Sequence, residues 1–289
     1  MAALSEAETP TADAVLPRPL VFRSDLLAGQ TALVSGGGTG IGQATALLLA
    51  TLGAHVAICG RRPERLEATR ALITDATEVH CIAVPTNIRE PDQVDALFER
   101  VHDALGTLDL VVNNAGGQYP QHSIDLSDKG WRAVVDTNLN GTWTMMQRAA
   151  RHWRAADRGG AIVNIIAPYI RGMYGIAHTV ASRAGVAYLS RNVAVEWAPL
   201  GIRVNCVLPA GIATEGLQTY APEVRAEMAA NHPLRMLGDG QDVAEAVVYL
   251  AAPSGRFITG ETVTLDGGHQ IHGDLWQAGR PEGWENPHD

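Results

Sequence analysis

Short apolar runs alternate with longer, helix-like segments along most of this 289-residue chain. Each run is short enough for a buried strand, and the first, TALVS, ends directly in glycines. Strands are expected at 31–35, 55–60, 79–84, 108–112, 161–166, 202–208 and 261–265. Helices are expected at 41–52, 63–73, 91–105, 130–154, 178–198 and 239–251. Since such alternation builds β-α-β units with right-handed crossovers, we predict an α/β fold whose doubly wound parallel sheet of about seven strands carries helices on both faces.

One domain accommodates this pattern, because α/β domains of about 200 to 250 residues are common. Hydrophobic residues make up 46% and charged residues 18% of the chain, enough for a large buried core. We find no internal repeat and no linker. We therefore expect a loose N-terminal arm at 1–25, a single domain at 26–268 and a C-terminal arm at 269–289.

The charge balance and the N-terminus exclude several classes of protein. The formal net charge of -9 argues against a nucleic-acid partner, because binding there depends on neutralising phosphates. The N-terminus has no basic region followed by an apolar stretch, and no later run approaches about 18 apolar residues. We expect a cytoplasmic protein without membrane contact. Cys59, Cys81 and Cys206 lack metal-ligand spacing, so we expect no metal site and buried, reduced thiols.

A glycine-rich loop joins the first expected strand to the first expected helix. Gly36, Gly40 and Gly42 give the spacing G-x-x-x-G-x-G. Glycines there permit a tight turn and a close approach of the backbone to a pyrophosphate, which the helix N-terminus attracts. The context of strand, turn and helix predicts a Rossmann-like dinucleotide site. Its loop residues are Gly36, Gly38, Thr39, Gly40, Ile41 and Gly42.

Two arginines follow the second expected strand. Arg61 lies 19 residues after Gly42, where an acidic residue commonly holds the ribose 2′-hydroxyl of NAD. The nearest acid, Glu64, falls inside the next expected helix. Since guanidinium groups bind phosphates in a bidentate way, Arg61 and Arg62 favour NADP(H) as the cofactor. The alternative is that both are solvated surface residues.

Several motifs together resemble the short-chain dehydrogenase/reductase family over roughly residues 26–268. They are SGGGTGIG (35–42), NNAG (113–116), the Asn138 of DTNLNG, IVNI (162–165), IRVNCVLPAGIAT (202–214) and FITG…DGG (257–268). The resemblance implies cofactor contacts beyond the glycine loop, with Asn87 and Ile88 near the adenine, Asn114, Ala115 and Gly116 along the middle, Arg183 on the nicotinamide ribose, and Ile212 and Thr214 near the carboxamide and phosphates. It also implies a homotetramer built through helices 130–154 and 178–198 and strand 261–265.

The residues that usually handle the proton in this family are changed. Ile166 or Ala167 stands where a serine is expected, and Thr179 and Arg183 replace the tyrosine and lysine of Tyr-x-x-x-Lys. A tyrosine can donate a proton when a nearby cation lowers its pKa from about 10. Threonine is a far weaker acid, and arginine stays protonated. Pro209-Ala210 in place of Pro-Gly is a milder departure.

An atypical branch of the family departs in a similar way. The chain resembles peroxisomal trans-2-enoyl-CoA reductases through His178 and the run Ser182–Val186, and 2,4-dienoyl-CoA reductases through Tyr169, a tyrosine soon after the fifth strand. The resemblance implies that NADPH reduces the C=C bond of an acyl-CoA thioester. Tyr169 and Asn138 would then donate hydrogen bonds to the enolate oxygen, and Arg183 would add positive charge.

Two other functions remain open. A relocated acid would permit ordinary carbonyl or alcohol oxidoreduction. Loss of both serine and tyrosine would equally suit a non-catalytic NADP-binding protein. His178 is expected to be structural or gating, and the segment from Ile212 to about Gly238 is expected to form an apolar lid over the substrate.

Overall fold

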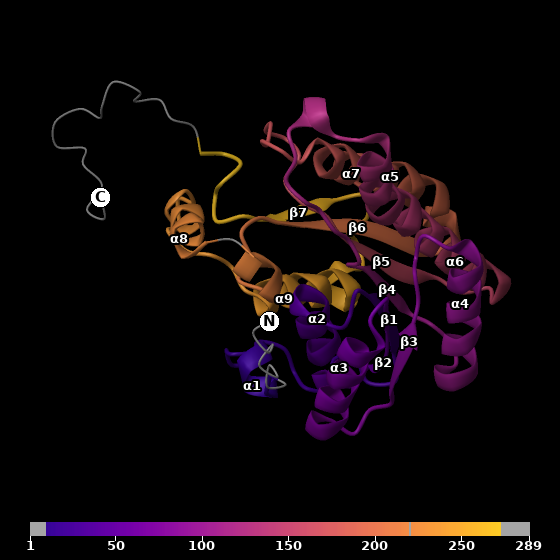
Figure 1. The fold of residues 1–289 in the computed structure, drawn as a ribbon. Helices are drawn as coiled ribbons and strands as arrows, with labels where there is room; N and C mark the ends of the chain where they lie inside the picture. Colours follow the sequence, from indigo (N-terminus) through magenta and orange to yellow (C-terminus); the bar gives the residue numbers. More distant parts are fainter. Residues whose placement is uncertain (1–9, 220, 273–289) are drawn as a thin grey trace.

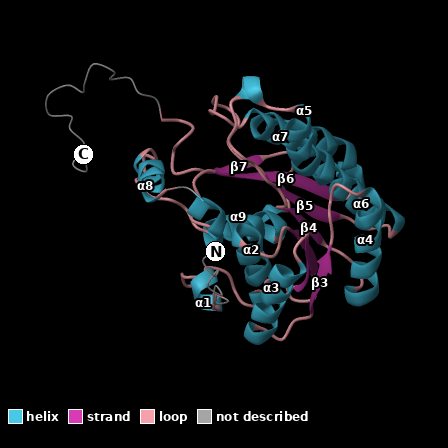
Figure 2. Ribbon diagram, in the orientation of Figure 1, coloured by secondary structure: helices cyan, strands magenta, loops and turns pink. Residues whose placement is uncertain are grey.

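The computed structural model describes residues 10–219 and 221–272, which form a parallel sheet between two layers of helices (Figures 1 and 2). The seven strands run in the order β3-β2-β1-β4-β5-β6-β7. Their bounds are β1 Thr31–Ser35, β2 His55–Gly60, β3 Cys81–Pro85, β4 Leu110–Asn113, β5 Gly160–Ile165, β6 Ile202–Pro209 and β7 Thr262–Leu265. The predicted α/β fold, a doubly wound parallel sheet of about seven strands, is confirmed.

Helices cover both faces of this sheet. On one face, α2 (Gly40–Thr51), α3 (Pro63–Ala76) and α9 (Gly240–Ala251) contribute to one buried apolar cluster. On the other face, α4 (Pro91–Leu105), α6 (Thr142–Ala155) and α7 (Ala177–Trp197) contribute to another. Strands buried on both sides explain why each one reads as an unbroken apolar run rather than an alternating one.

The strand order reverses direction at β1, which lies between β2 and β4. In open α/β sheets a crevice forms outside the carboxyl ends of the strands at such a point, and ligands bind there. The loops after β1, β2 and β4 are therefore the segments of the fold that build a site.

The long helix expected at 130–154 is three consecutive elements. α5 (Asp128–Val135) leads into a π-helical turn at Asp136–Gly141, and α6 follows. The π turn contains Asn138, which is fully buried and bonds to a distant loop. A π turn rotates the residues that follow it relative to a regular helix, and such turns are frequent at functional sites. A further helix, α8 (Pro222–Ala230), lies within the segment that was expected only as a lid.

Residues 10–25 lie against the domain rather than forming a loose arm. The short helix α1 (Ala12–Val15) begins this stretch, and Leu16, Leu20 and Phe22 pack against the cluster formed by α2, α3 and α9. The expected looseness is therefore wrong for this part of the arm, because its scattered apolar side chains find a surface to cover. Residues 1–9 and 273–289, which belong to the two predicted arms, lie outside the described residues.

Arg18 fastens this segment to the start of α9. Its backbone N–H donates to Gln241 Oε1 (2.9 Å), and its carbonyl accepts from Gln241 Nε2 (3.2 Å). Its guanidinium pairs with Asp239 and with Asp242, the latter at 2.8 Å. Asp239 and Asp242 form a capping box on α9, so Arg18 balances the two carboxylates that stabilise this helix N-terminus.

All three cysteines are buried free thiols. Burial raises the pKa of Cys59 to about 12, of Cys81 to about 12 and of Cys206 to about 11. The sequence-based expectation of reduced, packed thiols agrees with this. Within residues 10–219 and 221–272, no helix is both long and apolar enough to cross a bilayer.

Candidate functional site

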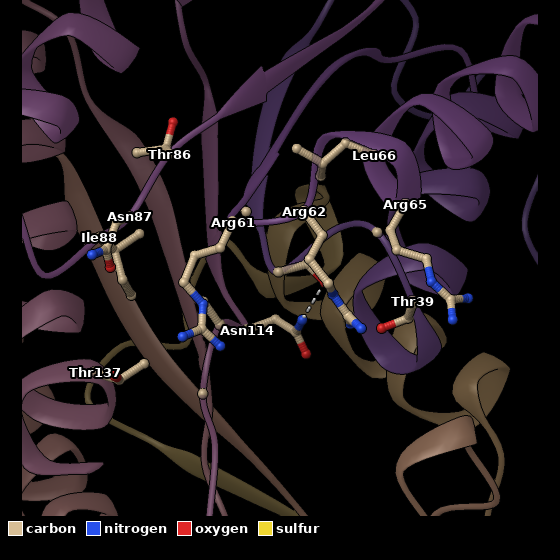
Figure 3. A pocket seen from close by; sticks show the side chains of 15 residues that line it. Thr39, Arg61, Arg62, Arg65, Leu66, Thr86, Asn87, Ile88, Asn114 and Thr137 are labelled. Atoms are coloured by element: carbon tan, nitrogen blue, oxygen red, sulfur yellow. Dashed lines mark hydrogen bonds between the residues drawn. The ribbon is translucent and has the colours of Figure 1, made fainter. Parts of the chain in front are cut away.

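A pocket opens where β1, β2 and β4 end, at the reversal point of the sheet (Figure 3). It is lined by Gly36, Gly38, Thr39, Gly60, Arg61, Arg62, Arg65, Leu66, Thr86, Asn87, Ile88, Asn114, Ala115, Gly116 and Thr137. Ten of these residues were predicted from the sequence as cofactor contacts. The pocket therefore gathers one ligand site from loops that are far apart in the chain.

The glycine loop is held in shape by the end of β4. Ser35 Oγ accepts from the backbone N–H groups of Asn114 (3.1 Å) and Ala115 (3.0 Å). Asn114 Nδ2 donates to the carbonyls of Ser35 and Gly36, each at 3.1 Å. Gly36 has φ +67°, and a Cβ there would lie 2.8 Å from Asn114 Nδ2. Only glycine allows this turn to lie so close to its neighbour.

The N-terminus of α2 completes one wall of the pocket. Thr39 is its N-cap residue, but its side chain makes no capping hydrogen bond. The first N–H groups of a helix have no intrahelical acceptor, and the helix dipole favours an anion beside them. Gly40, Ile41 and Gly42 belong to this first turn and do not line the pocket with side chains. They fit a pyrophosphate through the backbone, as the sequence implied.

Positive charge dominates the adenine end of the pocket. Arg61, Arg62 and Arg65 all line it, and no acidic residue does. In the view of Figure 3 the guanidinium groups of Arg62 and Arg65 are drawn on either side of Thr39, and that of Arg61 is drawn farther along the pocket. Arg65 was missed by the sequence reading. Its position three residues after Arg62, one helical turn along α3, was the signal that could have found it.

Arg183 is a buried cation with unused donors. Its side chain extends from α7 toward Gly116, where an added Cβ would lie 2.0 Å from Arg183 Nη2. Arg183 is 8% exposed, and its Nε and Nη1 have no hydrogen-bond partner. Burial lowers the pKa of its guanidinium to about 10. Buried donors without acceptors suit a ligand that brings oxygen atoms to this end of the pocket.

Asn138 has both of its polar atoms engaged by one residue. Its Oδ1 accepts from the N–H of Gly117, and its Nδ2 donates to the carbonyl of Gly117, each at 3.0 Å. The side chain is 0% exposed. Asn138 therefore fixes the loop after β4 beside Arg183. These contacts give Asn138 a positioning role, and its expected role as a direct donor to substrate stays a prediction.

The start of α7 buries a second polar group. His178 is 0% exposed, and its Nδ1 accepts from the backbone N–H of Thr179 (2.8 Å). An accepting Nδ1 places the proton of a neutral imidazole on Nε2, which is buried without a partner. The ring of Tyr119 packs edge-on against it at 4.9 Å. Thr179, at the family's tyrosine position, is 2% exposed beside it.

Tyr169 follows β5, in the stretch of chain that leads to α7, beside a small buried apolar cluster. It packs against Val186, Ala187 and Cys206, and the groups that act on its hydroxyl belong to Arg191, Cys206, Tyr188 and Thr262. Burial raises its pKa above the usual value, although Arg191 opposes the shift. Tyr188 and Arg191 follow Arg183 by five and eight residues, about 7 to 12 Å along a helix. Arg183 is not among the groups that shift the pKa of Tyr169, and the expected role of Tyr169 as a donor to substrate stays a prediction.

The segment after β6 meets the glycine loop through Thr214. An added Cβ on Gly40 would lie 3.3 Å from Thr214 Cβ, and Ile212 is buried at the base of this segment. Neither residue lines the pocket itself. Leu234 and Met236, which belong to the segment expected to form an apolar lid, are 68% and 55% exposed.

Comparison with known proteins identifies one family, whose matching members are named for different substrates. A family described as enoyl-(acyl carrier protein) reductase matches residues 36–270. A probable 2,4-dienoyl-CoA reductase of Bacillus subtilis (strain 168) is 35% identical over 83% of this chain and 96% of its own length. The cis-4-hydroxycyclohexanecarboxylate dehydrogenase of Sinomonas cyclohexanicum is 38% identical over 85% of this chain and 98% of its own. Among solved structures, a citronellol catabolism dehydrogenase of Pseudomonas aeruginosa PAO1 matches with a TM-score of 0.76, at 38% identity, over 86% of this chain and 98% of that one.

Proposed function

Because the chain belongs to the short-chain dehydrogenase/reductase family, we propose that it is an NADPH-dependent reductase of an activated C=C bond, in a 2-enoyl-CoA or 2,4-dienoyl-CoA thioester. The family consists of oxidoreductases that bind nicotinamide cofactors. The finer assignment rests chiefly on one observation: the family's acid is replaced by Thr179, and the cation beside it, Arg183, is buried with two unpaired nitrogens. The name of the Bacillus subtilis relative points to the same chemistry.

The pocket fits a dinucleotide that carries a 2′-phosphate. The glycine loop and the uncapped N-terminus of α2 suit a pyrophosphate, and three arginines in a pocket that no acidic residue lines suit an additional phosphate. A bound nicotinamide would supply the hydride. Asn114, Ala115 and Gly116 would hold the middle of the cofactor, and Asn87 and Ile88 would border its adenine.

The chemistry of a conjugated thioester suits the side chains at this end of the site. Hydride addition to a ketone leaves an alkoxide that must be protonated, and threonine cannot do this near neutral pH. Addition to the β-carbon of a conjugated thioester leaves an enolate, whose oxygen needs donors and whose α-carbon can take a proton from water. Arg183 supplies buried donors and charge for the ribose and the enolate, and Asn138 positions the neighbouring loop. The Nε2–H of His178 is a second buried donor on the same end of α7.

NADPH consumption with a panel of substrates tests this proposal. We expect turnover with crotonyl-CoA or 2,4-hexadienoyl-CoA and none with simple ketones. Ketone turnover without thioester turnover would favour carbonyl chemistry with a relocated acid. Tight NADPH binding without any turnover would favour a non-catalytic binding protein.

A tyrosine variant tests the proton path. Since burial raises the pKa of Tyr169 and Arg183 is not among the groups that lower it, we expect Tyr169→Phe to keep thioester turnover within about threefold of the wild-type rate. Losing one donor to a developing oxyanion typically costs about 10²–10³ in rate. A loss of that size would restore Tyr169 as the donor that the sequence suggested.

A further inference from the structure

We propose that Arg65 and Arg62 form the 2′-phosphate site and that Glu215, from the segment after β6, competes with the phosphate for Arg65. This inference rests on the proposed use of NADPH. It names a specificity-determining residue outside the pair predicted from the sequence. It also connects cofactor choice to the segment that borders the substrate side.

The position of Arg65 supports a direct role. Arg62 is the N-cap residue of α3, and Arg65 lies one turn later on the same helix. The two guanidinium groups flank Thr39, whose hydroxyl is not engaged in capping α2 (Figure 3). An added Cβ on Gly38 would lie 3.1 Å from Arg65 Cβ, so the helix passes close to the glycine loop. Two cations and a hydroxyl in the lining of one pocket supply donors that a phosphate needs.

Arg61 serves a different part of the pocket. In Figure 3 its guanidinium is drawn farther from Thr39 than those of Arg62 and Arg65, on the side of the pocket where Thr137 and Ile88 lie. The sequence placed the 2′-phosphate on Arg61 because that residue follows β2 directly. The structure instead brings Arg65 to the place opposite Arg62.

Arg65 already holds an anion from its own chain. Its Nη1 lies 3.3 Å from Glu215 Oε1 and 3.2 Å from Glu215 Oε2. The two side chains are 40% and 51% exposed, so the pair is weak and readily exchanged for another partner. A phosphate carries more charge than a carboxylate and accepts through more oxygens, so it should displace Glu215.

Glu215 transmits this exchange to the segment after β6. It is the first residue of a 3₁₀ turn, Glu215–Thr219, and directly follows Thr214, which borders Gly40. NADPH would break the link between α3 and this turn, whereas NADH, which lacks the phosphate, would leave the link in place. Glu215 thereby lowers the affinity for NADPH and does not affect NADH.

Equilibrium binding of four proteins tests the proposal. NADPH and NADH dissociation constants are measured by nicotinamide fluorescence for the wild type, Arg65→Met, Glu215→Gln and the double variant. We expect Arg65→Met to weaken NADPH by roughly 10- to 100-fold, the range for one hydrogen bond to a charged group, with NADH unchanged. Glu215→Gln should tighten NADPH by about two- to fivefold, the strength of an exposed ion pair.

The double variant shows whether Glu215 acts through Arg65. We expect it to bind NADPH as Arg65→Met does, because without Arg65 there is nothing to compete for. Arg70→Met is the matched control, since Arg70 lies on the same helix and pairs with Glu67 at the surface. It should match the wild type with both cofactors.

The outcomes separate this inference from the proposed cofactor. A wild type that binds NADH as tightly as NADPH would sink both. If the wild type prefers NADPH and Arg65→Met binds NADPH as tightly as the wild type does, the Arg65 site alone is contradicted. Glu215→Gln binding NADPH no tighter than the wild type would overturn the competition. Displacement by 2′,5′-ADP against 5′-AMP repeats the comparison without a nicotinamide.

Discussion

A buried charge without a partner is expensive, and Arg183 is one. Most buried cations in proteins are paired, because an isolated charge loses its hydration without compensation. Here the guanidinium nitrogens Nε and Nη1 have no acceptor, and burial lowers the pKa to about 10. We infer that a bound ligand offsets this cost, because its oxygen atoms would accept hydrogen bonds from the unpaired guanidinium nitrogens. Gly116 leaves the space that the guanidinium occupies.

Removal of the Arg183 charge should therefore raise the stability of the protein and lower its activity. We expect Arg183→Met to raise the unfolding free energy of the cofactor-free protein by roughly 1–3 kcal/mol, since a buried uncompensated charge is replaced by an apolar side chain of similar length. The same variant should lose NADPH affinity and about 10²–10³ in turnover. Urea unfolding, NADPH titration and thioester reduction measure the three quantities.

The pH dependence of this gain follows from the direction of the pKa shift. Burial disfavours the charged form of Arg183 in the folded protein. The resulting loss of folding stability is therefore full well below pH 10, and it decreases as the pH rises through the folded-state pKa of about 10. The stability gain of Arg183→Met should shrink accordingly. Arg191→Met, which changes an exposed arginine on the same helix, is the control and should show neither effect. An Arg183→Met protein less stable than the wild type at pH 7 would contradict this reading.

At the scale of elements, the link between residues 10–25 and α9 depends on polar contacts of unequal value. The ion pairs of Arg18 are 30–40% exposed, whereas Gln241 is 0% exposed and bonds to the backbone of Arg18. Exposed pairs contribute little, whereas loss of the buried Gln241 amide would leave the part-buried backbone groups of Arg18 without their partners, at a cost in desolvation.

Two variants should reveal this difference. We expect Arg18→Met to lower the unfolding free energy by at most about 1 kcal/mol and Gln241→Met by about 1–3 kcal/mol. Arg23→Met, which removes a surface pair with Asp25, should have almost no effect. Equal losses for Arg18→Met and Gln241→Met in urea titrations would show that the side-chain ion pairs hold the segment instead.

Local patterns predicted most elements, and distant contacts account for those that differ. The strands at 31–35 and 55–60 and the helix at 91–105 have the expected bounds, because apolar runs, glycines and prolines mark them locally. The π turn at Asp136–Gly141 had no such mark. It accompanies two hydrogen bonds between Asn138 and Gly117, 21 residues away. α8 did carry a signal, Pro222 at its first position followed by Glu223, which the sequence reading overlooked.

The candidate site divides in the same way. The glycine loop, Arg62 and the turn around Asn114 were predictable because each follows a strand end directly. Arg65 needed the helical period of α3, and the path of the chain between β5 and α7 decides where Tyr169 lies. That path depends on packing against Val186 and Cys206, which no local pattern around Tyr169 indicates.

At the scale of the whole molecule, we predict a homotetramer, as the family resemblance implies. Exposed apolar side chains on α5 and α7 are consistent with contacts between copies: Trp131, Tyr188 and Val195 are 40%, 65% and 78% exposed in the single chain. Light scattering should give four times the 30.7 kDa chain mass. Val195→Asp should lower the particle mass measured by light scattering without unfolding the subunit. A wild type that scatters as a 30.7 kDa particle would contradict the prediction.

The rates at which the three buried cysteines react with an alkylating reagent should report how the sheet unfolds. Alkylation needs a thiolate that the reagent can reach, so raised pKa values and burial should protect all three cysteines in the native state at neutral pH. Cys81 is 8% exposed on the edge strand β3, whereas Cys59 and Cys206 are 0% exposed on inner strands. In a timed iodoacetamide reaction read by mass spectrometry, Cys81 should be modified first, after local fraying of the edge. Cys59 and Cys206 should follow together, at the rate at which the whole sheet comes apart.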